Sequence, residues 1–133
     1  MTIKATITGP LVMLDCIGIL AEPDLDALFD AFAEARKKGP FVVITDTTHM
    51  KSSPAGVIRA FSDRLKKLPS LNKIWLGDAV VISSPAVRFV VSTLLMVAPL
   101  PTDVKVFERL VEARRWCTDI LTRSNLTVPE QRP

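Results

Sequence analysis

The sequence predicts a single α/β domain with a mostly parallel sheet of about five strands, an antiparallel edge strand and four helices. Three observations predict this class. From residue 11 onward, short apolar strand patterns alternate with amphipathic helical patterns. Two strand patterns open the chain, at 3–8 and 11–17, and only the turn Gly9-Pro10 separates them. The run Phe41-Val42-Val43-Ile44 is continuously apolar, which is typical of a strand covered on both faces.

The length and composition indicate one folding unit. The chain has 133 residues, of which 48% are hydrophobic and 23% are charged, which is ordinary usage for a globular domain. No internal repeat or linker divides it. We expect an α/β domain over residues 1–122 and a loose C-terminal tail over residues 123–133, where two prolines occur among few apolar residues.

The first two predicted helices are amphipathic and have recognisable ends. The first begins at Glu22-Pro23-Asp24, since a proline in the first turn favours a helix start, and it ends at Gly39. Its apolar stripe consists of Leu25, Leu28, Phe29 and Phe32. A strand at 41–45 and a polar loop lead to the second helix, which begins at Ser53-Pro54 and ends at Pro69. Its inner stripe consists of Val57, Ile58, Phe61, Leu65 and Leu68.

The second half of the chain repeats the alternation. The fourth strand region, 72–83, is interrupted at Gly77-Asp78 by either a bulge or a turn. A third helix over 86–97 follows Ser84-Pro85 and is apolar nearly all round, so it is either deeply buried or shared with a partner. A last strand is expected at 104–107 and a last helix at 108–122, with inward side chains Leu110, Ala113, Cys117, Ile120 and Leu121.

Several classes of protein are excluded by simple patterns. The longest apolar stretch, 89–100, contains Ser92, Thr93 and Pro99 and is shorter than the ~20 residues that a membrane span needs. The first eight residues contain no continuous apolar segment, so we expect no signal peptide and a cytoplasmic location. The net charge is +3, but the basic residues are dispersed and not interleaved with aromatic residues. We therefore expect no nucleic-acid partner.

The sequence predicts no metal and no cofactor. Cys16 and Cys117 lie in apolar strand and helix patterns without the spacing of a metal or redox pair, so we expect buried thiols. His49 is the only histidine and has no cysteine or histidine at ligand spacing. No Gly-x-Gly-x-x-Gly or Walker sequence is present to hold a nucleotide.

An enzyme is not supported either. Asp46, His49 and Ser52 or Ser53 supply the residue types of a hydrolase triad, but no Gly-x-Ser-x-Gly elbow accompanies them. A phospho-accepting Asp46 would need an acidic pair nearby, and Gly18-Ile19-Leu20 stands where that pair belongs. We expect the Asp46 carboxylate to accept backbone N–H groups of the following loop instead.

Ser53 has two interpretations that the sequence alone does not separate. Its hydroxyl is placed to cap the second helix by accepting the N–H of Ala55 or Gly56, which is worth about 1 kcal/mol. A phosphate on Ser52 or Ser53 would also lie at the positive end of that helix, near Lys51.

The order of elements and the segment from Asp46 to Ser53 resemble the STAS domain, the fold of bacterial anti-sigma-factor antagonists and of sulfate-transporter tails. The likeness covers residues 3–121. It looks most like the antagonist-like branch related to lipid-binding Sec14 domains, on the motifs Ser84-Pro85-Ala86-Val87-Arg88, Val106-Phe107 and Glu112-Ala113-Arg114-Arg115-Trp116.

The resemblance implies a regulatory protein-interaction module. In antagonists of this type, a kinase phosphorylates the second serine of an Asp-Ser-Ser-Gly segment. Lys51, Ser52, Ser53 and Pro54 occupy those places here, so both serines match while lysine and proline replace the aspartate and glycine. A kinase or an anti-sigma-type regulator is the implied partner. The expected contact residues are Asp46, Thr47, His49, Lys51, Ser52 and Ser53.

The alternative function is binding of a small apolar ligand or lipid, as in Sec14-like domains. The ligand would lie beneath the apolar third helix, against Phe89, Val90, Leu94, Met96 and Val97. Arg88 is the only charge within that helix and either pairs with an anion or extends to solvent. The same surface, marked by Arg88, Phe89 and Met96, would alternatively be covered by a second copy in a homodimer.

Overall fold

The computed structural model describes residues 2–68, 73–97 and 100–128, except for the side chains of Leu94 and Val97. Five strands and four helices follow in the predicted order. The strands are β1 (Thr2–Thr8), β2 (Leu11–Ile19), β3 (Phe41–Ser52), β4 (Trp75–Val81) and β5 (Val104–Phe107). The helices are α1 (Leu25–Lys38), α2 (Ala55–Lys66), α3 (Pro85–Val97) and α4 (Leu110–Arg123), and a short 3-10 turn at Glu22–Asp24 precedes α1. The fold class is confirmed.

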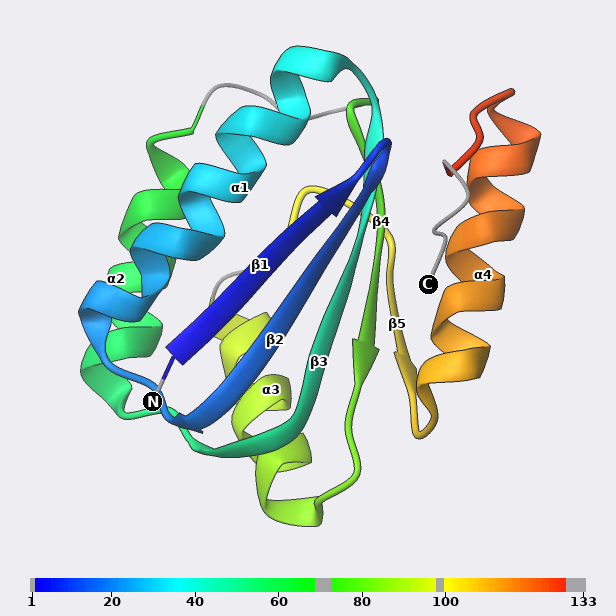
Figure 1. Ribbon diagram of the computed structural model, residues 1–133. Helices are drawn as coiled ribbons and strands as arrows, with labels where there is room; N and C mark the ends of the chain where they lie inside the picture. Colours follow the sequence, from blue (N-terminus) through cyan, green and yellow to red (C-terminus); the bar gives the residue numbers. More distant parts are fainter. Residues whose placement is uncertain (1, 69–72, 98–99, 129–133) are drawn as a thin grey trace.

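The strands form one sheet in the order β1-β2-β3-β4-β5. β1 pairs with β2 antiparallel, whereas β2, β3, β4 and β5 pair in parallel. Figure 1 shows α1, α2 and α3 on one side of the sheet and α4 on the other. Each face of the sheet therefore has its own helical layer and its own core.

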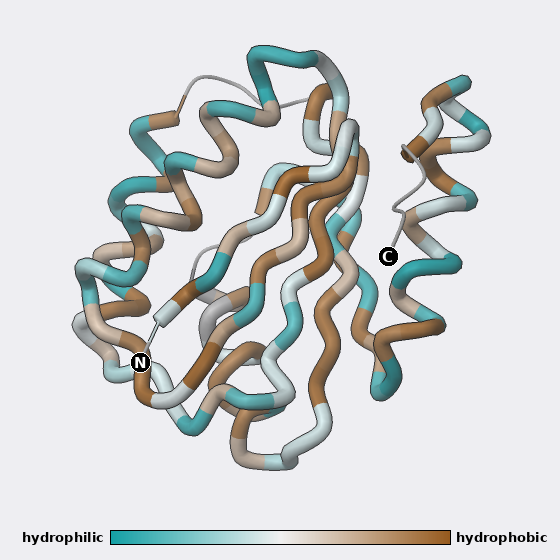
Figure 2. Tube along the Cα trace, in the orientation of Figure 1, coloured by the Kyte–Doolittle hydropathy of each residue, from teal (hydrophilic) through white to brown (hydrophobic). Residues whose placement is uncertain are grey.

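The larger core lies between the sheet and the layer of α1, α2 and α3. Phe32 on α1 lies against Trp75 on β4, with 4.9 Å between ring centroids, and Phe41 at the start of β3 packs beside both. In Figure 2 the hydrophobic colour follows the strands, while α1 and α2 carry polar colour between their apolar residues. The amphipathic stripes predicted for these helices are the faces that bury this core.

The smaller core lies beneath α4. Val42, Ile44, Ala79 and Val81 of the central strands contact Ala113, Cys117 and Leu121 of the helix. Beyond the helix, Leu126 and Val128 also pack against this cluster, and the Leu126 N–H donates to the Leu121 carbonyl at 2.8 Å. The described part of the C-terminal tail is thus held against the domain, and the domain boundary at residue 122 remains a prediction.

Two predicted boundaries are wrong, and one predicted alternative is confirmed. β3 continues to Ser52 instead of ending at residue 45, because β2 continues to Ile19 and pairs with it across two register shifts. Of the two alternatives predicted at Gly77-Asp78, the bulge is confirmed: both residues are part of β4, and Leu76 is the extra residue between the pairs Phe41–Trp75 and Val42–Gly77. α4 begins at Leu110 and not at Glu108. Pro69, the predicted end of the second helix, lies outside the described residues.

Within the described residues, no helix has both the length and the apolar character that crossing a bilayer requires.

Candidate functional site

Side chains at the end of β3 and just before α2 face either a cavity or solvent. Thr47, Met50 and Ser53 line a cavity beneath the helices, whereas Thr48, His49 and Lys51 are exposed. Thr47 is only 3% exposed, and its Oγ1 donates to the Val81 carbonyl at 2.6 Å. Thr47 is therefore removed from the expected contact surface, because a partner at the surface would not reach its side chain.

Ser53 does not cap α2. The residue at the N-cap position is Pro54, with extended backbone angles of −59° and 154°, and its carbonyl accepts the N–H groups of Val57 and Ile58 at 2.9 and 3.2 Å. Ser53 lies one residue too early to reach the first free N–H groups of the helix, and no side chain caps it. The capping interpretation is wrong, and the half-buried Ser53 lines the cavity instead.

Asp46 binds the chain that follows it, as expected. Its Oδ1 accepts the Thr48 N–H at 2.9 Å and the Thr48 hydroxyl at 2.6 Å. Among the described residues, no hydrogen bond joins Asp46, His49 and the two serines. The geometry of a hydrolase triad is therefore not formed by these side chains.

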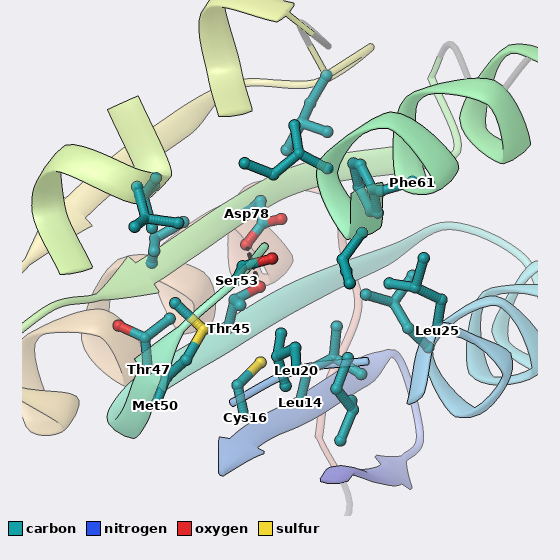
Figure 3. A pocket seen from close by; sticks show the side chains of 18 of the residues that line it. Leu14, Cys16, Leu20, Leu25, Thr45, Thr47, Met50, Ser53, Phe61 and Asp78 are labelled. Carbon is teal, nitrogen blue, oxygen red and sulfur yellow. Dashed lines mark hydrogen bonds between the residues drawn. The ribbon is translucent and has the colours of Figure 1, made fainter. Parts of the chain in front are cut away.

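The cavity lies inside the larger core and has a volume of about 100 Å³. Every helix of that layer contributes apolar side chains to it, including Leu25 from α1, Phe61 from α2 and Val91 from α3. Figure 3 shows how few polar groups interrupt this lining. They are Cys16, Thr45, Thr47, Ser53, Trp75 and Asp78, and among the described residues the buried Trp75 Nε1 has no hydrogen-bond partner.

Asp78 is the one acidic side chain in the lining. It is 4% exposed, and its Oδ1 accepts the Thr45 hydroxyl at 2.9 Å, which Figure 3 shows as a dashed line. Burial raises the pKa of the Asp78 carboxyl from 3.8 to about 7, and the Thr45 hydrogen bond acts in the opposite direction. Near neutral pH the cavity therefore holds a carboxyl group that exists in both protonation states.

The sequence contained a signal for Asp78 that we did not use. It is the single charged residue between Ile74 and Ile82, in an otherwise apolar run. We interpreted the dipeptide Gly77-Asp78 as an interruption of a strand, whereas an acidic residue within a buried strand also marks a candidate site.

The two cysteines are buried, as predicted. Neither forms a disulfide. Burial raises the pKa of both thiols to about 12, and for Cys16 the nearby carboxylates of Asp15 and Asp78 contribute in the same direction. Thiols in this state are poor nucleophiles, so they add no catalytic group to the cavity.

α3 divides its apolar residues between the cavity and solvent. Val90, Val91 and Leu95 line the cavity. Phe89 and Met96 are 74% and 84% exposed, so their prediction as residues facing a ligand beneath the helix is wrong. The predicted Leu94 and Val97 side chains lie outside the described residues. A homodimer through the outer face of α3 stays a prediction, which light scattering at high concentration checks.

Arg88 faces a second hollow, of about 410 Å³, that is polar and open. It is lined by residues from the start of α3 and from the turn before α4, namely Ile82, Ser83, Ser84, Pro85, Arg88, Glu108 and Arg109. Ser84 lies at the start of α3, and its Oγ lies 3.5 Å from the Val87 N–H, which it accepts as a weak cap.

Comparison with known proteins identifies the fold. No family model matches the sequence, and no curated protein matches it. Solved structures with a similar fold include the following two. One is an uncharacterised protein of the DUF3478 family with a SpoIIAA-like fold from Shewanella loihica, with a TM-score of 0.62, 16% identity, and coverage of 87% of this chain and 92% of that chain. The other is an anti-sigma factor antagonist from Mycobacterium paratuberculosis, with a TM-score of 0.52, 12% identity and the same two coverages.

Both neighbours align over most of their length, and their identities are low, so the similarity concerns the arrangement of the elements. In this chain, that arrangement consists of the sheet order, the antiparallel first strand and the division of the helices between the two faces. The fold expected from the STAS resemblance is confirmed: the chain has the SpoIIAA-like α/β fold that an anti-sigma factor antagonist also has.

Proposed function

We propose that this protein is a STAS-like regulatory module of the cytoplasm that acts by binding another protein. One observation carries the proposal: the last residues of β3 expose Thr48, His49 and Lys51 beside the first turn of α2, in a fold shared with an anti-sigma factor antagonist. The contact surface consists of Asp46, Thr48, His49, Lys51 and Ser52. Thr48 joins the predicted set and Thr47 leaves it.

Charge reversal at Lys51 is expected to remove the partner. The partner is first identified by affinity capture with the wild-type protein from its own cells and is then measured by quantitative mass spectrometry. We propose that an acidic group of the partner lies opposite Lys51. Lys51→Glu is expected to lower recovery of the partner at least about ten-fold, because two negative charges would then face each other across the interface. Lys66→Glu reverses the same charge at the exposed C-terminal end of α2 and serves as the matched control. Equal recovery of the partner with both variants would contradict the proposed surface.

A serine switch is the finer form of this proposal, with a kinase as a further partner. The half-buried Ser52 and Ser53 lie between Lys51 and the helix start, where a phosphate adds up to two negative charges. A phosphate on Ser53 would also meet the apolar lining of the cavity and disturb this junction. If phosphosite mapping finds neither serine modified in the native cell, and Ser53→Asp leaves partner recovery unchanged, the switch is absent.

Ligand binding in the cavity is a second candidate function, and the cavity itself is the observation that favours it. Natural cores are close-packed, and an engineered apolar cavity of about 150 Å³ is enough to bind benzene. By that comparison, the cavity of about 100 Å³ would hold a ligand of roughly four non-hydrogen atoms or the end of a longer chain.

Filling the cavity is expected to remove such a ligand. In native mass spectra of protein from its own cells, we expect an added mass on the wild type that Val91→Phe lacks, because Val91 is 7% exposed and lines the cavity. Phe89→Ala changes the outer face of the same helix and is expected to keep the added mass. Spectra at the bare chain mass for the wild type and both variants would speak against the ligand.

A further inference from the structure

Asp78 is buried without a cationic partner in a cavity that otherwise has no charged lining. The residues that surround the cavity include no lysine, arginine or histidine. The described structure gives the carboxyl a single hydrogen bond, from Thr45, although a carboxylate has about four acceptor sites. Burying a carboxylate with so little compensation is unfavourable, and the fold keeps it at the cavity surface.

We propose that the cavity binds a small aliphatic amine, with the ammonium group of the ligand paired to Asp78 and its hydrocarbon part against the apolar lining. This inference rests on the second candidate function, ligand binding in the cavity. A buried charge is normally paired, and the cationic partner that the chain omits is the group that a ligand would supply. A neutral alcohol can donate a hydrogen bond to Asp78, but it carries no positive charge to pair with the carboxylate.

The hydroxyl groups in the lining fit the same ligand. An ammonium group carries three donors and no acceptor, so it needs oxygen atoms around it. Thr47 donates its proton to the Val81 carbonyl, which leaves its Oγ1 as an acceptor, and Ser53 adds a second hydroxyl oxygen to the lining. Thr45 uses its proton on Asp78, so its oxygen is an acceptor too. Apart from the Nε1–H donor of Trp75, which has no partner among the described residues, the side-chain oxygens of the lining therefore offer acceptors to an ammonium group.

The size of the cavity selects short chains. Propylamine has four non-hydrogen atoms, which is about the number that the volume allows. 1-Propanol and propanoate have the same three-carbon chain and replace the cation by a neutral donor or an anion. The three molecules together separate the hydrocarbon contribution from the charge contribution.

The test is calorimetric titration of the wild-type protein with these three probes at pH 8. We expect propylamine to bind about ten-fold more tightly than 1-propanol, which is the effect of a hydrogen-bonded charge pair, and propanoate not to bind. Binding of all three with equal affinity, or of the alcohol alone, would overturn the amine proposal while the ligand function stands. Heat signals that are absent for all three would overturn both.

pH and an isosteric variant provide the second readout. The affinity for propylamine is expected to fall on going from pH 8 to pH 5, as Asp78 takes up its proton, while the affinity for 1-propanol stays constant. Cys16 in the lining and Cys117 across the sheet are the other titratable groups near Asp78, and both keep their protons over this range. The lining residues from α1, α2 and α3 are uncharged.

Asp78→Asn is expected to bind propylamine and 1-propanol equally, once circular dichroism shows that the variant is folded. Retention of the amine preference by the folded variant would contradict the role of Asp78. If this variant does not fold, the affinities of the wild-type protein for the three probes and their change with pH are enough to test the proposal.

Discussion

Asp78→Asn is expected to gain stability over the wild type as the pH rises. The Asp78 carboxyl has a pKa near 3.8 when it is exposed and about 7 in the folded protein. Between these values the folded chain holds a proton that the unfolded chain has released, so each rise in pH favours unfolding. The contribution of Asp78 is therefore most favourable below about pH 4 and is lost as the pH rises through about 7.

The expected size follows from the same shift. One pKa unit corresponds to about 1.4 kcal/mol, so the free energy of unfolding of the variant relative to the wild type grows by roughly 2–3 kcal/mol between pH 5 and pH 8. Urea denaturation of both proteins at the two pH values measures this difference. Asp30→Asn removes an exposed carboxylate from α1 and controls for net charge. If the free energies of unfolding of Asp78→Asn and the wild type differ by the same amount at both pH values, the pKa of Asp78 is not raised in the folded protein.

Gly77→Ala is expected to destabilise the protein by about 1–3 kcal/mol, although alanine normally suits a strand better than glycine. A Cβ at this position would lie 2.9 Å from Ile120 Cδ1 and 2.9 Å from Trp116 Cη2, both on α4. The Ile120 methyl can rotate away, but the Trp116 ring is larger and rigid. α4 would therefore have to move outward from β4.

Two further variants make this measurement specific. Trp116→Ala should reduce the effect of Gly77→Ala in a double-mutant cycle, because it removes the rigid ring, one of the two side chains that the new Cβ would meet. Gly56 in α2 has no neighbour within 4 Å of its Cβ position, and Gly56→Ala is expected to stabilise the protein by up to about 1 kcal/mol. Denaturant midpoints compare all of these proteins. Similar stabilisation by both alanine substitutions would contradict the tight packing at Gly77.

The sequence predicted the elements better than the direction of their side chains. The last strand is found at Val104–Phe107 as predicted, because its apolar run is short and clearly bounded. The polar segment from Asp46 to Lys51 was interpreted as a loop, but pairing with β2 extends the strand through it. Pairing between distant segments supplies hydrogen bonds that local composition does not reveal.

The cavity could not be predicted from the sequence for a related reason. Asp78 and Thr45 are 33 positions apart, and only the parallel pairing of β3 with β4 brings them into contact. α3 is apolar around most of its surface, so its pattern did not distinguish Val91, which is buried, from Phe89, which is exposed. What the sequence did predict is the location of the junction between β3 and α2, which lies at the edge of this cavity.

The two cysteines lie in different layers of the molecule, so their thiols report separately on the opening of each layer. Cys16 lines the cavity beneath α1, α2 and α3, whereas Cys117 lies under α4, with its Sγ 3.8 Å from the Val43 carbonyl. Both thiols are protected by burial, so an alkylating reagent reaches each one only when its own layer opens. The labelling rates of the two sites therefore measure the opening of the two faces of the sheet independently in the unmodified protein.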